Sequence, residues 1–304
     1  MGACVFWWGF FWLGFVALYM KLELKKFDMR MIKDGSTVLF IGRRGCGKSV
    51  LVTDMFRHHT KVPLGIIVSA TEKANHHFEQ FIPKMLIYDE FDPKILQKFM
   101  DRQEKVTDQA VMEKKKYGRT DIDNRAFLVL DDCLYDKTWP NDKNIRACFM
   151  NGRHYGILFA LTMQYPLGIP PHLRANVDYV FILRDNNFKN RERIYQQYAG
   201  MFNSFDVFGQ VMDQCTDNFE CLVINNKTQS NVLTDQVYWY KADPSINFKC
   251  CSDALWHAQA REDELLAMAG NEATNNDEED FNPALSIKKN NKSPHITVKK
   301  REHH

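Results

Sequence analysis

Short apolar runs alternate with amphipathic stretches through the middle of this chain. The runs occupy residues 37–41, 65–69, 85–88, 127–130, 157–162 and 179–183, and turn residues bound them. Helical patterns lie between most of the runs, including a helix that Asp92 and Pro93 begin and that continues to residue 116. Buried strands that alternate with helices are typical of a parallel sheet. The pattern therefore predicts an α/β fold with a mostly parallel central sheet flanked by helices.

The pattern changes beyond residue 184. There we expect a charged helix near 187–201, strands near 221–224 and 237–240, and a helix over 252–268. Residues 271–304 are rich in Asn, Asp, Glu and Lys and poor in apolar residues, which is typical of a disordered tail. We therefore expect one core domain over 26–245, a C-terminal helix within 246–270 and a polar tail over 271–304.

The first 25 residues form a separate hydrophobic segment. Residues 4–20 are apolar throughout and are followed by Lys21, Lys25 and Lys26. This length is at the lower edge of a membrane span, and lysines on its C-terminal side would keep the body of the protein in the cytoplasm. Two interpretations stay open. The segment is an anchor that contacts a membrane, or it is an over-extended start, with Met20 or Met29 opening the protein.

Charge and cysteine usage exclude some classes of protein. The 304 residues carry a formal net charge of +2, so no global basic field attracts nucleic acid, and such a partner would meet a local patch. The eight cysteines show no paired C-x-x-C spacing. We therefore expect reduced thiols in a cytosolic setting, without a zinc site.

Residues 42–49 read Gly-Arg-Arg-Gly-Cys-Gly-Lys-Ser and match the phosphate-loop pattern G-x-x-x-x-G-K-[ST], directly after an apolar run. Glycines let backbone N–H groups face phosphate oxygens, Lys48 brings a positive charge to the β- and γ-phosphates, and the Ser49 hydroxyl ligates Mg²⁺. A helix over 48–59 would direct its positive N-terminal end at the same phosphates. The expected nucleotide-binding residues are Gly42, Arg43, Arg44, Gly45, Cys46, Gly47, Lys48, Ser49 and Val50.

Two carboxylates end the apolar run at 127–130. Asp131 would hold the Mg²⁺ ion opposite Ser49, and Asp132 would orient and deprotonate the attacking water. The alternative is that these acids cap the next helix.

The run at 157–162 also ends in polar side chains, because Thr162 closes it and Gln164 follows. Ligands bind at the carboxyl ends of strands in such sheets, so Gln164 could sense the γ-phosphate or position water. A structural hydrogen bond to the next loop is the alternative for Gln164.

The stretch between the two motifs contains further strand candidates, at 65–69 and 85–88. We therefore expect a strand to lie between the two motif strands in the sheet. This is the additional-strand arrangement of ATP-driven motors.

Beyond these motifs the chain resembles the FtsK/HerA superfamily of RecA-like P-loop ATPases. It most closely resembles the genome-packaging ATPases of poxviruses and other nucleocytoplasmic large DNA viruses. The resemblance covers residues 26–240. It rests on 42–49, on 127–132, and above all on Asn-Gly-Arg-His-Tyr-Gly at 151–156 and the segment from Gln-Tyr-Pro at 164–166 to Asp-Tyr-Val-Phe at 178–181.

The resemblance implies an ATPase that uses ATP and Mg²⁺, with Lys48 and Ser49 contacting nucleotide and metal, Asp131 anchoring the metal, Asp132 as base and Gln164 as sensor. Cellular members usually place Glu after the metal-binding Asp. Asp132 is one methylene shorter and departs from the cellular pattern at this position.

The resemblance also implies partners. It implies a homo-oligomeric, hexamer-like ring that drives double-stranded DNA into a capsid, working with capsid or inner-membrane components. The protein would act in the host cytoplasm at viral assembly sites or in the virion. An arginine from a neighbouring subunit would stabilise the transferred phosphoryl group. Arg153 and Arg174 are the candidates, with Arg184 a weaker third, and a surface salt bridge is the alternative for each.

Two other classes of function stay open. A GTPase is disfavoured because Asn-Lys-Thr-Gln at 226–229 lacks the aspartate of the guanine motif N-K-x-D. A small-molecule kinase would use an arginine-rich lid, and residues 184–193 could imitate one. A membrane-anchored assembly factor, with ATP binding as a structural switch, would give the N-terminal segment the central role.

Overall fold

The computed structural model describes residues 22–133, 139–166 and 168–273. The apolar segment at 4–20 and most of the tail expected over 271–304 lie outside these residues. None of the described helices combines the length and the apolar character that a membrane span requires.

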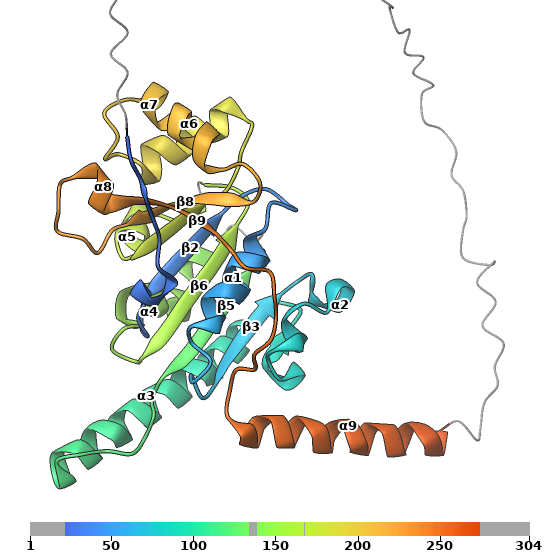
Figure 1. Cartoon of the computed structure of the whole chain (residues 1–304). Coiled ribbons are helices and arrows are strands. Elements are labelled where there is room, and N and C mark those ends of the chain that lie inside the picture. Colours follow the sequence, from blue (N-terminus) through green and yellow to red (C-terminus); the bar gives the residue numbers. More distant parts are fainter. Residues whose placement is uncertain (1–21, 134–138, 167, 274–304) are drawn as a thin grey trace, which may run out of the picture. The chain divides into compact units, whose positions relative to one another are not determined.

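One nine-stranded sheet organises the described residues, in the order β1-β9-β8-β7-β2-β6-β5-β3-β4 (Figure 1). Neighbouring strands from β7 to β4 are parallel, and β8 is antiparallel to both β7 and β9. The short strand β1 pairs in parallel with β9 at the edge. The strands are β1 (Lys25–Lys26), β2 (Thr37–Ile41), β3 (Gly65–Ser69), β4 (Ile87–Tyr88), β5 (Ala126–Asp131), β6 (Ile157–Met163), β7 (Tyr179–Ile182), β8 (Glu220–Asn225) and β9 (Val237–Lys241).

Every residue of β2, β3, β5, β6 and β7 is buried. Helices and loops cover both faces of a parallel sheet, so its strands are apolar throughout instead of alternating. Leu39 and Phe159 belong to the core on one face, whereas Phe40 and Leu158 belong to the core on the other. The central sheet flanked by helices is therefore confirmed.

The helices divide between these two cores. Helix α1 (Lys48–Arg57) packs on one face, and Figure 1 shows it lying over the sheet. The opposite core takes residues from α3 (Pro93–Tyr117), α4 (Lys143–Asn151), α5 (Pro171–Arg174), α6 (Phe188–Tyr198) and α7 (Phe205–Cys215). Two further helices are short, α2 (Glu72–Asn75) and α8 (Leu233–Gln236). The described residues also contain 3₁₀ turns at Met29–Met31, Phe78–Gln80, Lys84–Leu86 and Trp139–Asn141.

Sequence patterns located most elements and missed some. The expected strands 37–41 and 65–69 agree with β2 and β3 at both ends. The strand expected over 85–88 is reduced to Ile87–Tyr88, because a 3₁₀ turn after Pro83 occupies Lys84–Leu86. Helices α4 and α7 were not predicted. Side-chain caps at Asp142 and Ser204 begin them, so the local signal for both helices was present in the sequence.

A strand does lie between the two motif strands, but it comes from a different segment than the sequence pattern indicates. The candidates between the motifs are β3 and β4, which lie on the side of β5 that faces away from β2. Strand β4 is the last strand of the sheet on that side. The inserted strand is β6, which follows the second motif along the chain and pairs with both β2 and β5. The order of strands in a sheet is a long-range property, which local patterns do not encode.

The chain divides into two units after Gln259, within helix α9 (Asp253–Ala273). In the first unit the Trp256 indole Nε1 donates to the Cys250 carbonyl at 2.8 Å. In the second unit residues 261–268 are exposed.

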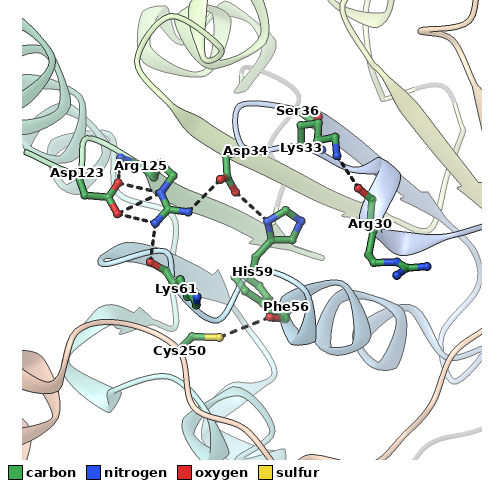
Figure 2. Close-up of polar contacts among 10 residues, drawn as sticks. All are labelled: Arg30, Lys33, Asp34, Ser36, Phe56, His59, Lys61, Asp123, Arg125 and Cys250. Atoms are coloured by element: carbon green, nitrogen blue, oxygen red, sulfur yellow. Dashed lines mark hydrogen bonds and ion pairs between the residues drawn. The ribbon is translucent and has the colours of Figure 1, made fainter. Parts of the chain in front are cut away.

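A polar cluster joins the loops that precede β2, β3 and β5 (Figure 2). These loops lie at the amino ends of the parallel strands, whereas the phosphate loop follows the carboxyl end of β2. The Asp34 carboxylate lies 2.9 Å from Nδ1 of His59 and accepts from Arg125 at 3.2 Å. Arg125 also donates to Asp123 at 2.6 Å and to the Lys61 carbonyl at 3.1 Å. The hydrogen bond from His59, with a further contribution from Arg125, lowers the pKa of Asp34. These contacts tie three loops together.

We predict that Asp34→Asn reduces the loss of stability in acid. Because the folded-state pKa of Asp34 is lowered, its contribution is present above the unfolded value of about 3.9 and is lost as pH falls through the folded value. The free energy of unfolding, measured in urea from pH 5 to pH 2, should fall less steeply in the variant. Asp108→Asn, on the exposed face of α3, is the control and should keep the native slope. An unchanged slope in Asp34→Asn would contradict the role of this cluster.

Gly65→Ala should destabilise the sheet. A Cβ at Gly65 would overlap the ring and the carbonyl oxygen of Phe127 on the neighbouring strand β5. We expect the free energy of unfolding to fall by about 1–3 kcal/mol, as for other overpacked cores. The matched control is Gly209→Ala in α7, where a Cβ meets no atom within 4 Å. That change should stabilise by about 0.4–1 kcal/mol, and equal effects of the two changes would count against the close approach.

Candidate nucleotide-binding site

The loop between β2 and α1 is shaped by glycine. Gly45 and Gly47 have φ of 77° and 103°, which side chains with a Cβ rarely adopt. A Cβ at Gly42 would lie 2.5 Å from the Cys46 sulfur, so the loop folds tightly on itself. Gly47 is the N-cap of α1 and provides no side-chain cap. The first N–H groups of this 10-residue helix are therefore left for an anionic ligand.

Lys48 is 6% exposed and is held from three directions. Its Nζ donates to the carbonyl oxygens of Gly42 at 2.9 Å and Arg43 at 3.3 Å. It also forms an ion pair with Oδ2 of Asp132 at 3.0 Å. Two carbonyl groups of the phosphate loop thus position the ammonium group, and Asp132 balances its charge.

Asp131, the last residue of β5, is buried between two hydroxyl groups. Thr162 on β6 donates to its Oδ1 at 2.7 Å, and Ser69 on β3 donates to its Oδ2 at 3.0 Å. Strand register pairs Asp131 with both residues, so the three side chains form one row across β3, β5 and β6. Burial and the nearby Asp132 raise the pKa of Asp131, and the two hydroxyl groups oppose that rise. A carboxylate has about four lone-pair sites, so capacity remains for a further ligand.

Asp132 turns out of the strand into the site. Its φ of 47° lies in the left-handed region, which a short polar side chain tolerates better than most. Its backbone N–H donates to Oγ1 of Thr162 at 3.0 Å. Its Oδ2 accepts from Nε2 of Gln164 at 3.0 Å and contacts Nζ of Lys48 at the same distance. Three residues expected to be catalytic therefore meet at one oxygen atom.

The three arginines considered for catalysis lie in different places. Arg153 is exposed beside Gly35, in the turn that precedes β6, at the edge of the sheet opposite the phosphate loop. Arg174 donates to the Ile169 carbonyl at 3.3 Å and its guanidinium lies 5.4 Å from the Tyr198 ring centroid. The structure brings neither of them to Lys48 within one chain. Their catalytic role stays a prediction.

Arg184 alone among the three lies at the phosphate loop of its own chain. It lines a cavity of about 650 Å³. The other lining residues are Arg43, Arg44, Gly45, Cys46, Gln164, Tyr165, Asn186 and Asn190. Arg43, Arg44 and Arg184 give this cavity a positive wall, which suits phosphate groups.

The residues present fit a magnesium nucleotide. Mg²⁺ at nucleotide sites is usually held by one or two protein oxygens together with phosphates and water. Ser49 in the first turn of α1 and Asp131 provide such oxygens. Within the described residues no group of three or more His, Cys, Asp or Glu side chains gathers as a metal site would require. The metal would therefore depend on the phosphates for its other ligands.

Ser69 was missed by sequence analysis, and Thr162 was noted without its role. The signal was weak, because each is a single hydroxyl residue that closes an apolar strand. Only the register of three parallel strands shows that both hydroxyl groups contact Asp131.

The phosphate loop, the acid pair and the strand order define a P-loop NTPase of the additional-strand class. No known protein-family model matches the chain. Uncharacterized protein L437 of Acanthamoeba polyphaga mimivirus is 38% identical over 225 residues, which are 74% of this chain and 78% of that protein. Uncharacterized protein 075L of Invertebrate iridescent virus 6 is 36% identical over 234 residues, 73% of this chain and 86% of that protein. The chain belongs to the same family as these proteins of nucleocytoplasmic large DNA viruses.

Solved structures are similar at the level of fold. EssC ATPases 2 and 3 of Geobacillus thermodenitrificans align with a TM-score of 0.50 at 14% identity, over 78% of this chain and 44% of that chain. The DNA-packaging ATPase B204 of Sulfolobus turreted icosahedral virus aligns with a TM-score of 0.46 at 16% identity, over 70% of this chain and all of B204. The likeness is one of fold, and the expected P-loop ATPase fold with its mostly parallel central sheet is confirmed.

Thr162→Val should destabilise the site. The valine has the same shape but cannot donate to Asp131 or accept from the Asp132 N–H, which leaves both groups short of a partner. We expect the free energy of unfolding in urea to fall by about 1–3 kcal/mol. Thr162→Ser keeps the hydroxyl and is the control. A loss as large in the serine variant would show that the methyl group matters instead.

Proposed function

We propose that this protein is an ATP-driven motor that translocates double-stranded viral DNA into the capsid during virion assembly. The observation that carries the ATPase part is the meeting of Lys48, Gln164 and Asp132 at one carboxylate oxygen. A cation for the phosphates, a water-orienting acid and a sensing amide are the parts that phosphoryl transfer to water requires.

The geometry suggests how these side chains would act. A γ-phosphate in the loop competes with Asp132 for the Lys48 ammonium, because phosphate carries more negative charge than a carboxylate. Once Lys48 moves to the phosphate, Asp132 loses its ion pair and can accept a proton from water. Gln164 then holds Asp132 in place and connects the phosphate to β6. When bound, Mg²⁺ would neutralise charge on the phosphates, with Ser49 and Asp131 holding it.

The DNA part of the proposal has separate support. The segments 151–156 and 164–181 carry the resemblance to genome-packaging ATPases, and the relatives that match the chain are proteins of large DNA viruses. In such a motor a ring of identical subunits would enclose DNA, and Arg153 or Arg174 would reach the neighbour's nucleotide. We propose capsid or inner-membrane components as further partners, action at cytoplasmic assembly sites or in the virion, and membrane contact through residues 4–20.

The kinase hypothesis gains nothing from the structure. Each arginine that could have formed a lid contacts another side chain of the same chain. Arg184 forms an ion pair with Asp217, and Arg191 forms one with Asp213. The guanidinium of Arg193 lies 5.1 Å from the centroid of the Tyr165 ring. A lid that closes over a second substrate would require these contacts to break.

ATP hydrolysis by the full chain should rise when long double-stranded DNA is added. Lys48→Ala and Asp132→Asn should each reduce the hydrolysis rate by about 100-fold or more, because each removes a group needed for phosphoryl transfer. Phosphate release measured with and without DNA gives both quantities.

Lys105→Ala, on the exposed face of α3, serves as the control and should hydrolyse ATP at the native rate. Hydrolysis that is indifferent to DNA would count against a DNA motor. Native activity in Asp132→Asn would remove Asp132 from the mechanism.

A further inference from the structure

The turn between α7 and β8 has an unusual residue at its tip. Residues Asp217 to Glu220 form a tight turn in which the Glu220 N–H donates to the Asp217 carbonyl at 2.8 Å. Both central residues have positive φ, 50° at Asn218 and 63° at Phe219. Two consecutive positive φ values define a type I′ turn, for which Asn-Gly is the preferred sequence. Phenylalanine therefore occupies a position that favours glycine.

This placement is unfavourable in two ways. A bulky residue in the left-handed region is strained by about 1–2 kcal/mol. The strain is not offset by burial, since the Phe219 side chain is 68% exposed. Strained backbone clusters at active sites, ligand clamps and switch regions.

The position of the ring points to the ligand. Cδ1 of Phe219 lies 3.5 Å from the place where a Cβ on Gly47 would stand, so the ring borders the phosphate loop directly before Lys48. Strand β8 is antiparallel to β7, which places the start of β8 at the carboxyl edge of the parallel strands. The ion pair between Asp217 and Arg184 joins the turn to a residue that lines the cavity beside the loop.

The other exposed aromatic residue at this site is already occupied. The Tyr165 ring carries the Arg193 guanidinium on its face, and its hydroxyl accepts from the same arginine. Among the described residues, no ring and no cation stacks on Phe219. Its ring thus offers a free apolar face next to the site of the phosphates.

We propose that Phe219 is the base-binding platform of this site and that the purine ring of the bound nucleoside triphosphate stacks on it. The inference rests on the proposed nucleotide binding and adds the residue that recognises the base. Stacking depends on ring area and not on a hydrogen-bond pattern. The full chain should therefore bind ATP and GTP more tightly than CTP and UTP.

The test compares ATP with inorganic triphosphate, which can occupy the phosphate loop but has no base. Phe219→Ala in the full chain should weaken ATP binding by about 5- to 150-fold, the range for loss of one base–aromatic stack. Its affinity for triphosphate should stay within about 2-fold of the native value, because the loop itself is unchanged. Phe219→Tyr should keep native ATP affinity. Tyr117→Ala, an equally exposed aromatic residue at the end of α3, is the matched control.

Phe219→Gly separates function from folding. Glycine relieves the turn, so the Tm should rise by a few degrees, while ATP affinity falls as in the alanine variant. A merely structural role for the ring predicts the opposite change in Tm.

Three outcomes would overturn the inference. Phe219→Ala could bind ATP with native affinity, could lose ATP and triphosphate equally, or could lose subunit association while keeping nucleotide affinity. Failure of the native chain to bind either ligand would instead reject the proposed nucleotide function together with this inference. The two failures are therefore distinguishable.

Discussion

Parallel pairing of β3, β5, β6 and β2 is the constraint on which the site depends. Because these neighbours run in one direction, the residues that end them meet at one edge of the sheet. Register then places Ser69, Asp131 and Thr162 in a row, and Asp132 and Gln164 follow directly after their strands. The phosphate loop leaves β2 at the same edge. A slip of one residue in any pair would turn these side chains to the opposite face.

Charge at this edge is held in balance by few groups. A carboxylate as buried as Asp131 is costly, and the two hydroxyl donors offset part of that cost. Lys48 is nearly as buried and depends on Asp132 for its counter-charge. A phosphate ligand would take over that role and release Asp132. The ion pair therefore supplies the counter-charge that the buried ammonium group of Lys48 requires.

The amino ends and the carboxyl ends of the parallel strands differ in their contacts and in their backbone conformations. At the amino edge Asp34 and Arg125 tie loops together (Figure 2). At the carboxyl edge strain is concentrated, since Asp132, Asn218 and Phe219 all have positive φ beside the phosphate loop. Strained backbone persists only where the surrounding structure holds it in place.

The sequence by itself determined the chemistry and the main elements. A run such as 37–41 is buried on both faces, and the spacing of Gly42, Gly47, Lys48 and Ser49 encodes a loop whose geometry is local, so both could be predicted. Tertiary structure alone decided which strand lies between the motif strands, that Ser69 and Thr162 support Asp131, and that Phe219 borders Gly47. These facts depend on strand order, register and a turn some 170 residues from the loop. Long-range pairing sets them, and residue patterns within one segment carry no information about which distant segment will pair with it.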